Sequence, residues 1–415
     1  MTATDILVIG GGITGLAATA ALAGAGFEVG CVDPAPADMA AAPRLDGRTT
    51  ALFPDAVRTL SAVGAWDACT DVSAGLWTMR IVDDGPGGPK HAATFESRDL
   101  PGGGPFGWNV PNATLRQALI ARLAELPNAE HLSGRTVEEL RFAGPHAEAT
   151  LSDGREIHAT LVIGADGKKS MTRDAAGIAA RAWAYGQTAM AFSVAHSRAH
   201  EGISTEFHRP QGPLVLVPMR GNASSVVWVE RERAAETFSQ LDRASFRRIF
   251  AERLHGTLGR IEDIGRVGTY PVTTLLADAY AGHRVALIGE AAHGLPPIGA
   301  QGLNLGLTDV AVLTEALAEA RRNGQDIGAH AILRGYERRR RPDVVARVAG
   351  VDALNRAVMT RNPALRAARH LGVRALAGCA PVRRALMQTA MSPLGRRPAM
   401  SGGTLVRPVA SHTGT

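Results

Sequence analysis

The chain has 415 residues, of which 45% are hydrophobic and 20% charged, a balance typical of a globular protein with room for two cores. Aromatic residues make up only 5%, which argues against a protein that works by stacking nucleic-acid bases. The net charge is +6, but residues 353–415 hold ten arginines and no acidic residue, so residues 1–352 carry about −4. The basic character belongs to the C-terminal segment, and we expect no nucleic-acid partner.

Cysteine usage and the N-terminal residues bear on the cellular compartment. Cys31, Cys69 and Cys379 are far apart and include no Cys-x-x-Cys pair, which fits a reducing compartment and suggests neither a disulfide framework nor a metal site. The N-terminus carries no basic segment and no cleavage site. No run of about eighteen apolar residues occurs either. We therefore expect a cytoplasmic protein with no export signal and no membrane-spanning helix.

The first elements in chain order form a βαβ unit over residues 5–33. Residues 6–9 are a short apolar run, as expected of a buried parallel strand. Residues 17–25 are rich in alanine and suit a helix packed closely on a sheet, and residues 27–32 are the next strand. Such a unit is the core of many nucleotide-binding domains.

Two patterns alternate along the rest of the chain. The helix expected at 112–126 and the buried strands at 157–163 and 284–288 continue the α/β pattern, which ends in a long helix around 304–322. Residues 185–272 have alternating strands instead, typical of an antiparallel sheet. A sheet domain is therefore inserted into a discontinuous nucleotide-binding domain.

A glycine-rich turn follows the first strand and opens the first helix. It contains Gly10, Gly12 and Gly15, which respectively make the turn, let a pyrophosphate approach the backbone and let the helix pack on the strand. The helix N-terminus supplies amide donors and positive potential for phosphate. Asp33 ends the second strand, where its carboxylate can accept hydrogen bonds from ribose hydroxyls. This combination predicts a dinucleotide site but does not distinguish FAD from NAD.

Two later strands also end in a glycine beside an acid. Asp166 and Gly167 follow the strand at 157–163, and on their own they are typical of an ordinary β-turn. The stretch 289–306 is longer and contains two adjacent prolines and several glycines before a helix begins near Gly302. The prolines stiffen this backbone and the glycines let a flat ligand lie against it. A helix N-terminus pointing at a flavin would stabilise negative charge on its reduced ring.

The three motifs, in this order, resemble those of the p-hydroxybenzoate-hydroxylase-like FAD-dependent monooxygenases, and the chain is most similar to the ubiquinone-biosynthesis hydroxylases among them. The likeness extends to about residue 360, and the Pro-Pro-x-Gly-Ala-Gln-Gly-Leu-Asn sequence at 296–304 is its most specific part. The other supporting segments are 46–52, 183–187, 213–218 and 336–343.

The resemblance implies roles for individual residues. The first glycine turn and Asp33 would hold the ADP half of FAD, and Arg48 and Arg116 would lie along the cofactor near its phosphates. In the family, the turn that matches Asp166 and Gly167 serves both FAD and the pyridine nucleotide.

Two positions depart from the family pattern. Glu290 stands where the family's Gly-Asp motif has aspartate, so its longer side chain makes direct contact with the cofactor an open question, and Lys168 and Lys169 replace a more usual arginine. His293 is interpreted as a loop histidine fixed by a backbone hydrogen bond, and no catalytic side chain is named. The residues expected to bind FAD are Gly10, Gly12, Ile13, Thr14, Gly15, Asp33, Arg48, Arg116, Asp166, Gly167, Gly289, Glu290, Pro297, Gly299, Gly302, Leu303 and Asn304.

The activity that the resemblance implies is hydroxylation of a prenylated phenol in ubiquinone synthesis. NAD(P)H would reduce the flavin, O2 would add to give a C4a-hydroperoxide, and its distal oxygen would attack the electron-rich ring. No second dinucleotide motif occurs, so NAD(P)H would bind transiently as a co-substrate. The alternatives are another flavin enzyme of this fold, such as a halogenase or a prenyl reductase, and a non-catalytic flavin-binding component of a biosynthetic complex. The absence of a Trp-x-Trp pair counts against a halogenase.

The expected fold is α/β, with a discontinuous Rossmann-like FAD-binding domain, an inserted antiparallel β-sheet substrate domain and C-terminal helices. The FAD-binding domain is assigned to 1–75, 106–184 and 273–350, the substrate domain to 76–105 and 185–272, a basic helical segment to 351–398 and a flexible tail to 399–415. The segment 353–398 has an amphipathic pattern with arginines on one side. It would dock on the inner face of a membrane or on a membrane-bound quinone-biosynthesis complex, or it would pack on the enzyme's own acidic body, and the sequence leaves these alternatives open.

Overall fold

A parallel sheet with helices on its faces forms one part of the molecule. The computed structural model describes residues 2–36, 48–85, 88–142, 144–360, 362, 364, 371–372, 378–393 and 395–404. The parallel strands lie in the order β19 (Val285–Leu287), β11 (Glu156–Gly164), β1 (Thr2–Ile9), β2 (Val29–Asp33) and β8 (Ala129–Ser133), with β18 (Ala281–Gly282), β10 (Ala147–Leu151) and β9 (Val137–Arg141) added antiparallel. This is the sheet that the buried apolar runs of the sequence predict.

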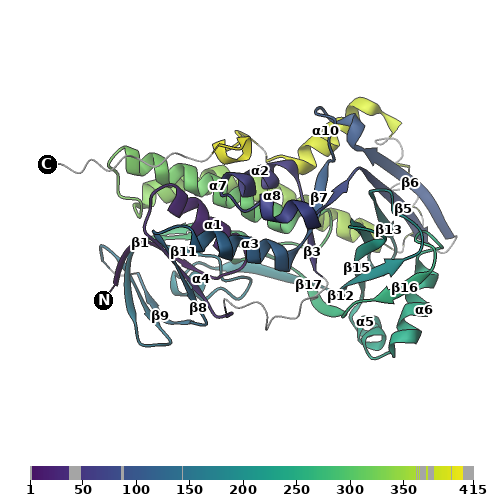
Figure 1. Ribbon diagram of the computed structural model, residues 1–415, viewed down its shortest axis with the longest axis horizontal. Coiled ribbons are helices and arrows are strands. Elements are labelled where there is room, and N and C mark those ends of the chain that lie inside the picture. The colour runs from purple at the N-terminus through teal and green to yellow at the C-terminus, as the bar shows by residue number, and fades with distance from the viewer. Residues whose placement is uncertain are drawn as a thin grey trace.

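Helices cover this sheet because their apolar faces are buried against it. The helices are α1 (Ile13–Gly24), α2 (Pro54–Ala62), α3 (Asn112–Ala124), α4 (Met171–Ala175), α7 (Gln301–Arg322) and α8 (His330–Met359). The alanines of α1 lie at 0–4% exposure, so small side chains let this helix approach the sheet and α7 closely. Figure 1 shows α7 and α8 running side by side along the molecule.

A second, larger sheet forms the other end of the molecule in Figure 1. Its strands are β5 (Thr78–Gly85), β6 (Gly88–Glu96), β12 (Ala180–His196), β13 (Ile203–His208), β14 (Leu214–Met219), β15 (Ala223–Arg231), β16 (Ile261–Ile264), β17 (Gly268–Ala277) and β20 (His293–Gly294). Helices α5 (Glu232–Ser239) and α6 (Arg243–Arg253) pack on one face around Phe192, Trp228 and Phe250. Residues 88–96 form an edge strand of this sheet, paired antiparallel with β5.

The predicted fold class is confirmed, with one difference in strand direction. The second sheet is antiparallel except that β13 pairs with β5 in parallel, so the sheet is mixed. A small third sheet, β3 (Thr49–Leu52), β7 (Gly107–Pro111) and β4 (Ala74–Leu76), lies where the chain passes between the two parts. The domain boundaries given above stay a prediction.

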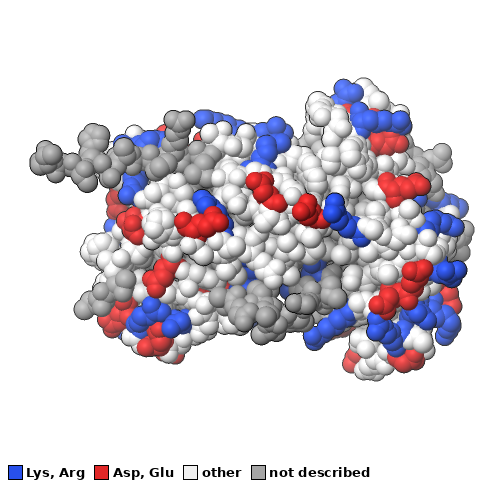
Figure 2. Space-filling model, viewed as in Figure 1, with Lys and Arg blue, Asp and Glu red and all other residues white. Residues whose placement is uncertain are grey.

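The C-terminal helix α10 (Ala380–Met391) packs on the rest of the chain. Met387 is buried with Leu76 and Phe106, and Arg383 donates two hydrogen bonds to the Asp99 carboxylate at 2.7 and 2.8 Å. In the described part of the chain no helix has the length and apolar character needed to cross a membrane. Figure 2 shows acidic and basic side chains interspersed over the face in view.

Candidate functional site

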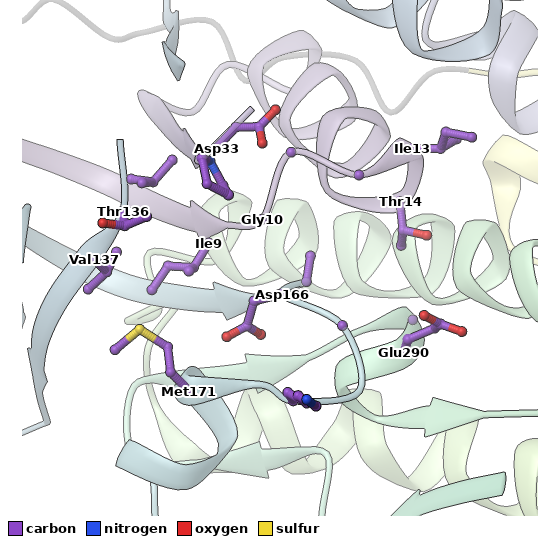
Figure 3. A pocket seen from close by; sticks show the side chains of 18 of the residues that line it. Ile9, Gly10, Ile13, Thr14, Asp33, Thr136, Val137, Asp166, Met171 and Glu290 are labelled. Atoms are coloured by element: carbon purple, nitrogen blue, oxygen red, sulfur yellow. The ribbon is translucent and has the colours of Figure 1, made fainter. Parts of the chain in front are cut away.

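A large cavity lies at the carboxyl ends of β1 and β2, where α1 begins. Its volume is about 670 Å³. Residues from all three expected cofactor motifs line it, and Figure 3 shows them converging from separate elements. The lining includes Gly10, Gly12, Ile13, Thr14, Asp33, Asp166, Gly167, Gly289, Glu290, Gly302 and Leu303, eleven of the residues expected to bind FAD. We call this space the first cavity.

In the glycine turn, close contacts leave no room for a side chain at Gly10 and Gly15 but leave Gly12 open. Gly10 has φ +113°, and a Cβ there would lie 2.4 Å from the Ala165 carbonyl oxygen. A Cβ on Gly15 would lie 1.8 Å from the Gly10 carbonyl oxygen, so glycine lets α1 pack against the turn. At Gly12 an added Cβ would meet nothing within 4 Å. Gly12 lines the first cavity, so its open side leaves space for a ligand at the N-terminus of α1.

Asp33 is buried, and its carboxylate has two hydrogen-bond donors and a histidine nearby. Arg116 Nη2 donates to Asp33 Oδ2 at 2.5 Å, the amide of Ala35 donates to Oδ1 at 3.0 Å, and His131 Nε2 lies 3.5 Å from Oδ2. Burial alone would raise the pKa of Asp33, but its interactions with His131, Ala35 and Arg116 outweigh it and keep the pKa below its usual value. Asp33 is therefore a fixed carboxylate at the edge of the cavity, and Arg116 orients it.

A buried ion-pair network holds the turn at Gly289 in place. Asp309, on α7, is fully buried, and its Oδ2 accepts hydrogen bonds from the Gly289 amide at 3.0 Å and from His293 Nε2 at 2.6 Å. Its Oδ1 accepts one from Arg340 Nε on α8 at 2.7 Å. Burial would raise the pKa of Asp309, but the charges of His293 and Arg340 outweigh it and lower the pKa. His293 is thus a structural residue, but a carboxylate fixes it rather than the expected backbone group.

The N-terminus of α7 faces the first cavity beside this turn. Gly302 and Leu303 line the cavity, and a Cβ on Gly306 would lie 2.8 Å from Thr14 Oγ1, so α1 and α7 begin in close contact. Gly299 and Ala300 both adopt positive φ, +65° and +54°, which sets the entry of the chain into α7. Two helix N-termini therefore direct positive potential toward one cavity.

Three expected ligands have their side chains engaged elsewhere. The Asp166 carboxylate accepts hydrogen bonds from Ser170 Oγ at 2.5 Å and from the amide and hydroxyl of Thr172 at 3.0 Å, so it caps the start of α4 while lining the cavity. Asn304 bonds the Phe53 amide and the Ala51 carbonyl, so it ties α7 to the chain after β3. The Arg116 guanidinium binds Asp33, which lines the cavity, as described above.

Arg48 and Pro297 line a second cavity rather than the first. This cavity has a volume of about 440 Å³ and lies between the two parts of the molecule. Its walls are mostly apolar side chains of the large sheet and the loop before α7, namely Ala189, Ala191, Val226, Val227, Val272, Leu295 and Pro297. Asn112 and Glu290 line both cavities, which are therefore neighbours. The guanidinium of Arg48 lies over the ring of Tyr270, 5.3 Å from its centre.

The far wall of the first cavity comes from residues that the sequence motifs missed. Arg135, Thr136, Val137 and Met171 line it, and Figure 3 shows Thr136, Val137 and Met171 at the end opposite Thr14 and Glu290. They lie after β8, in β9 and at the start of α4, with no glycine pattern or acid to mark them. The pairing of β2 with β8 brings Arg135 and the residues after it beside Asp33, and no local signal could reveal that.

Two other segments that carried the resemblance hold α8 against the two sheets. Trp183 Nε1 and the Tyr185 hydroxyl both donate to Asp352 Oδ1, at 3.0 and 2.6 Å, which ties β12 to α8. Tyr336 donates from its hydroxyl to the Leu287 carbonyl at 2.9 Å, which ties α8 to β19. These segments position the two cavities without lining them.

Together the features fit a dinucleotide with two phosphates. The first cavity offers an open glycine turn, two helix N-termini and a fixed carboxylate, and the second offers an apolar space beside it. Within the described residues no group of three or more His, Cys, Asp or Glu could hold a metal ion. The arrangement suits a cofactor in one cavity that acts on a largely apolar molecule in the other.

Comparisons with known proteins agree with this geometry. A family model described as an FAD binding domain matches residues 3–351. Ubiquinone hydroxylase UbiL of Rhodospirillum rubrum is 39% identical over 390 residues, covering 94% of this chain and 90% of that protein. The 3-demethoxyubiquinol 3-hydroxylase of Escherichia coli is 30% identical over 391 residues, covering 94% and 98%. The crystal structure of p-nitrophenol 4-monooxygenase PnpA from Pseudomonas putida superposes with a TM-score of 0.79 at 20% identity, covering 95% of this chain and 100% of that one, a likeness of fold.

Fold and family together define the protein as an FAD-dependent monooxygenase. Within that class the chain belongs to the ubiquinone-biosynthesis hydroxylase family. The predicted family and cofactor are confirmed, and the non-catalytic alternative is set aside. Which residues bind FAD stays a prediction.

Proposed function

We propose that this enzyme hydroxylates the ring of a prenylated phenol in ubiquinone synthesis, with NAD(P)H and O2 as co-substrates. The observation that carries the proposal is the second cavity. It adjoins the first cavity through Asn112 and Glu290, and its walls are mostly apolar, as an aromatic ring with an isoprenoid chain requires. The ubiquinone hydroxylases among the relatives support the substrate class.

FAD fits the first cavity because the turn at Gly12 is open and Asp33 is fixed beside it. The proposed binding residues are those expected from the sequence that line the cavity, together with Arg135, Thr136, Val137 and Met171 on its far wall. Bound there, FAD supplies electron transfer from NAD(P)H and the activation of O2. Glu290, which lines both cavities, would lie between cofactor and substrate.

The chain's own part in the reaction is to hold the ring and keep water away. The side chains of β12, β15 and β17 form a rigid apolar wall, because they stand on central strands of one hydrogen-bonded sheet. Asp309 and Arg340 hold the Gly289 turn in place from a fully buried position. No side chain of this chain needs to act as a nucleophile.

A gene deletion tests the substrate class. A strain that lacks this enzyme and has no other ring hydroxylase of the pathway should lose ubiquinone and accumulate a precursor with one hydroxyl group fewer. The gene restored on a plasmid should return ubiquinone to its normal level. Normal ubiquinone in the deletion strain would overturn the proposal.

Peripheral contact with a membrane is a further part of the proposal, because an isoprenoid chain is too apolar to leave the bilayer freely. The described arginines of 353–398 are engaged internally: Arg383 and Arg384 bind Asp99, and Arg356 binds Asp352. The stripe proposed for docking includes Arg366, Arg369, His370 and Arg374, which lie outside the described residues. Flotation with anionic vesicles at low salt tests the contact, and a protein that stays at the bottom of the gradient contradicts it.

A further inference from the structure

Lys168 occupies a distinctive place in the second cavity. Its turn follows β11, and Arg173 Nη2 donates to the Lys168 carbonyl at 3.2 Å, which fixes the backbone. The aliphatic part of its side chain packs against Gly294, where an added Cβ would lie 2.9 Å from Lys168 Cε. The ammonium group is thus carried to the cavity wall next to Glu290.

The ammonium group has hydrogen-bonding capacity left for a ligand. Lys168 Nζ donates to Thr273 Oγ1 at 3.1 Å and lies 3.5 Å from the carbonyl oxygen of the same residue. The Glu290 carboxylate lies 3.9 Å away, at the limit of an ion pair, and its side chain is 59% exposed. Because an ammonium group has three N–H donors and Thr273 alone among the described residues accepts hydrogen bonds from it, one donor remains for a substrate.

A phenol in this cavity needs such a partner. Electrophilic hydroxylation is faster on a phenolate than on a neutral phenol, because the ionised oxygen donates more electron density to the ring. Apolar surroundings disfavour the phenolate, whereas a cation within hydrogen-bond distance favours it. The charged or titratable groups around the ammonium are Arg48 and Glu290 across the cavity, Tyr270 on β17, and Asp166, Lys169 and Arg173 from its own turn and the helix after it.

We propose that Lys168 binds the hydroxyl oxygen of the substrate ring and holds it as the phenolate, the released proton passing to solvent. Arg48 is less suited because its guanidinium lies over the Tyr270 ring. The Glu290 carboxylate is only at the limit of an ion pair with the ammonium, so the phenolate can take its place there. The proposal rests on the proposed function and adds the residue that recognises the substrate's ionised oxygen.

The ionisation of a bound phenol tests the proposed role of Lys168 directly, without turnover. The probe is a 4-nitrophenol with a short prenyl group beside the hydroxyl, whose phenolate absorbs visible light. It is titrated with pH on oxidised holoenzyme in the absence of NAD(P)H, as a difference spectrum against holoenzyme alone. The wild-type enzyme should lower the pKa of the bound probe by about one unit relative to free probe. Lys168→Arg should keep most of this shift, whereas Lys168→Met should abolish or reverse it.

Two further variants distinguish a specific effect of Lys168 from a general effect of losing a positive charge. Lys90→Met removes an exposed lysine of β6 and should leave the probe's titration as in the wild type. Glu290→Gln should lower the probe's pKa further, because it removes the negative charge that competes with the phenolate. FAD absorbance and thermal melting check each variant's fold, and the Glu290→Gln result decides the matter if Lys168→Met does not fold.

Three results would overturn the assignment. These are a bound probe that titrates in Lys168→Met as in the wild type, a pKa that rises only in Arg48→Met, and an unchanged pKa in Glu290→Gln. In turnover, Lys168→Met should shift the pH profile of hydroxylation upward by about one unit. If the wild type forms no hydroxylated product at any pH, the proposed function fails. If product forms and the two profiles coincide, only the role of Lys168 fails.

Discussion

Replacing Asp309 by Asn tests how the cofactor turn is supported. The substitution keeps the shape of the side chain but removes a charge that is fully buried and faces Arg340 Nε at 2.7 Å and His293 Nε2 at 2.6 Å. Breaking one side of a buried ion pair costs about 3–5 kcal/mol, because the remaining charge stays buried without its partner. Arg340 still binds Asp343 at 2.7 Å, so we expect about 3 kcal/mol, the lower end of that range.

A matched control is Asp326→Asn. Asp326 makes two hydrogen bonds to Arg284, at 3.1 and 2.7 Å. Arg284 is 12% exposed but Asp326 is 44% exposed, so solvent screens the pair, and we expect a loss of about 1 kcal/mol, the upper end of the range for exposed pairs. The assay is urea unfolding with the same excess of free FAD, which keeps ligand stabilisation comparable. Similar midpoints for the two variants would refute the argument from burial. Asp309→Asn should also weaken FAD binding, since the Gly289 amide loses a charged acceptor.

Three further outcomes follow from the geometry. Gly12→Val should fold normally yet purify without FAD, because its side chain enters open cavity space. Gly15→Ala should not fold, because its Cβ would lie 1.8 Å from the Gly10 carbonyl oxygen. Absorbance and circular dichroism of the two variants check these outcomes, and a yellow Gly12→Val protein contradicts the first. The pKa of Asp33 is lowered in the folded state, so its ionised form stabilises that state above the unfolded-state value of about 3.9, and this contribution is lost as the pH falls through the lower folded-state pKa. FAD retained after gel filtration should therefore be constant down to about pH 5, and a loss that begins above pH 6 refutes the assignment. Arg383→Ala should speed proteolysis within α10, because it removes both hydrogen bonds to the Asp99 carboxylate. An unchanged cleavage rate would show that the other contacts of α10, among them buried Met387 and the bonds from Arg347 to the Thr389 and Ala390 carbonyls, are sufficient to anchor the helix.

The parts of the site with a local pattern could be predicted from the sequence. The turn at 10–15, Asp33 and the N-terminus of α7 lie where a strand, a glycine turn and a helix follow one another, so their geometry depends on neighbouring residues. Gly12 and Asp33 thus line the first cavity as expected, and the family and cofactor are confirmed. The roles of these residues as FAD ligands stay a prediction.

The parts that depend on distant contacts could not be predicted. Arg48 was expected near the cofactor phosphates but lines the second cavity, because β17 of the inserted sheet brings Tyr270 beside it. Asp309 is one of three acidic residues on α7, and its role depends on contacts with the Gly289 turn and with Arg340 of α8, which are distant in the sequence. The parallel pairing of β13 with β5 joins segments more than a hundred residues apart and leaves no mark in either strand.

The most direct test of the central claim is the source of the oxygen in the product. Purified holoenzyme should be incubated with a short-chain prenylated phenol and NAD(P)H under ¹⁸O2, and the products analysed by mass spectrometry. The proposed function predicts a ring-hydroxylated product that carries one ¹⁸O atom, formed in step with NAD(P)H oxidation. NAD(P)H oxidation that yields only hydrogen peroxide with every prenylated phenol tested, and no labelled product, would contradict it.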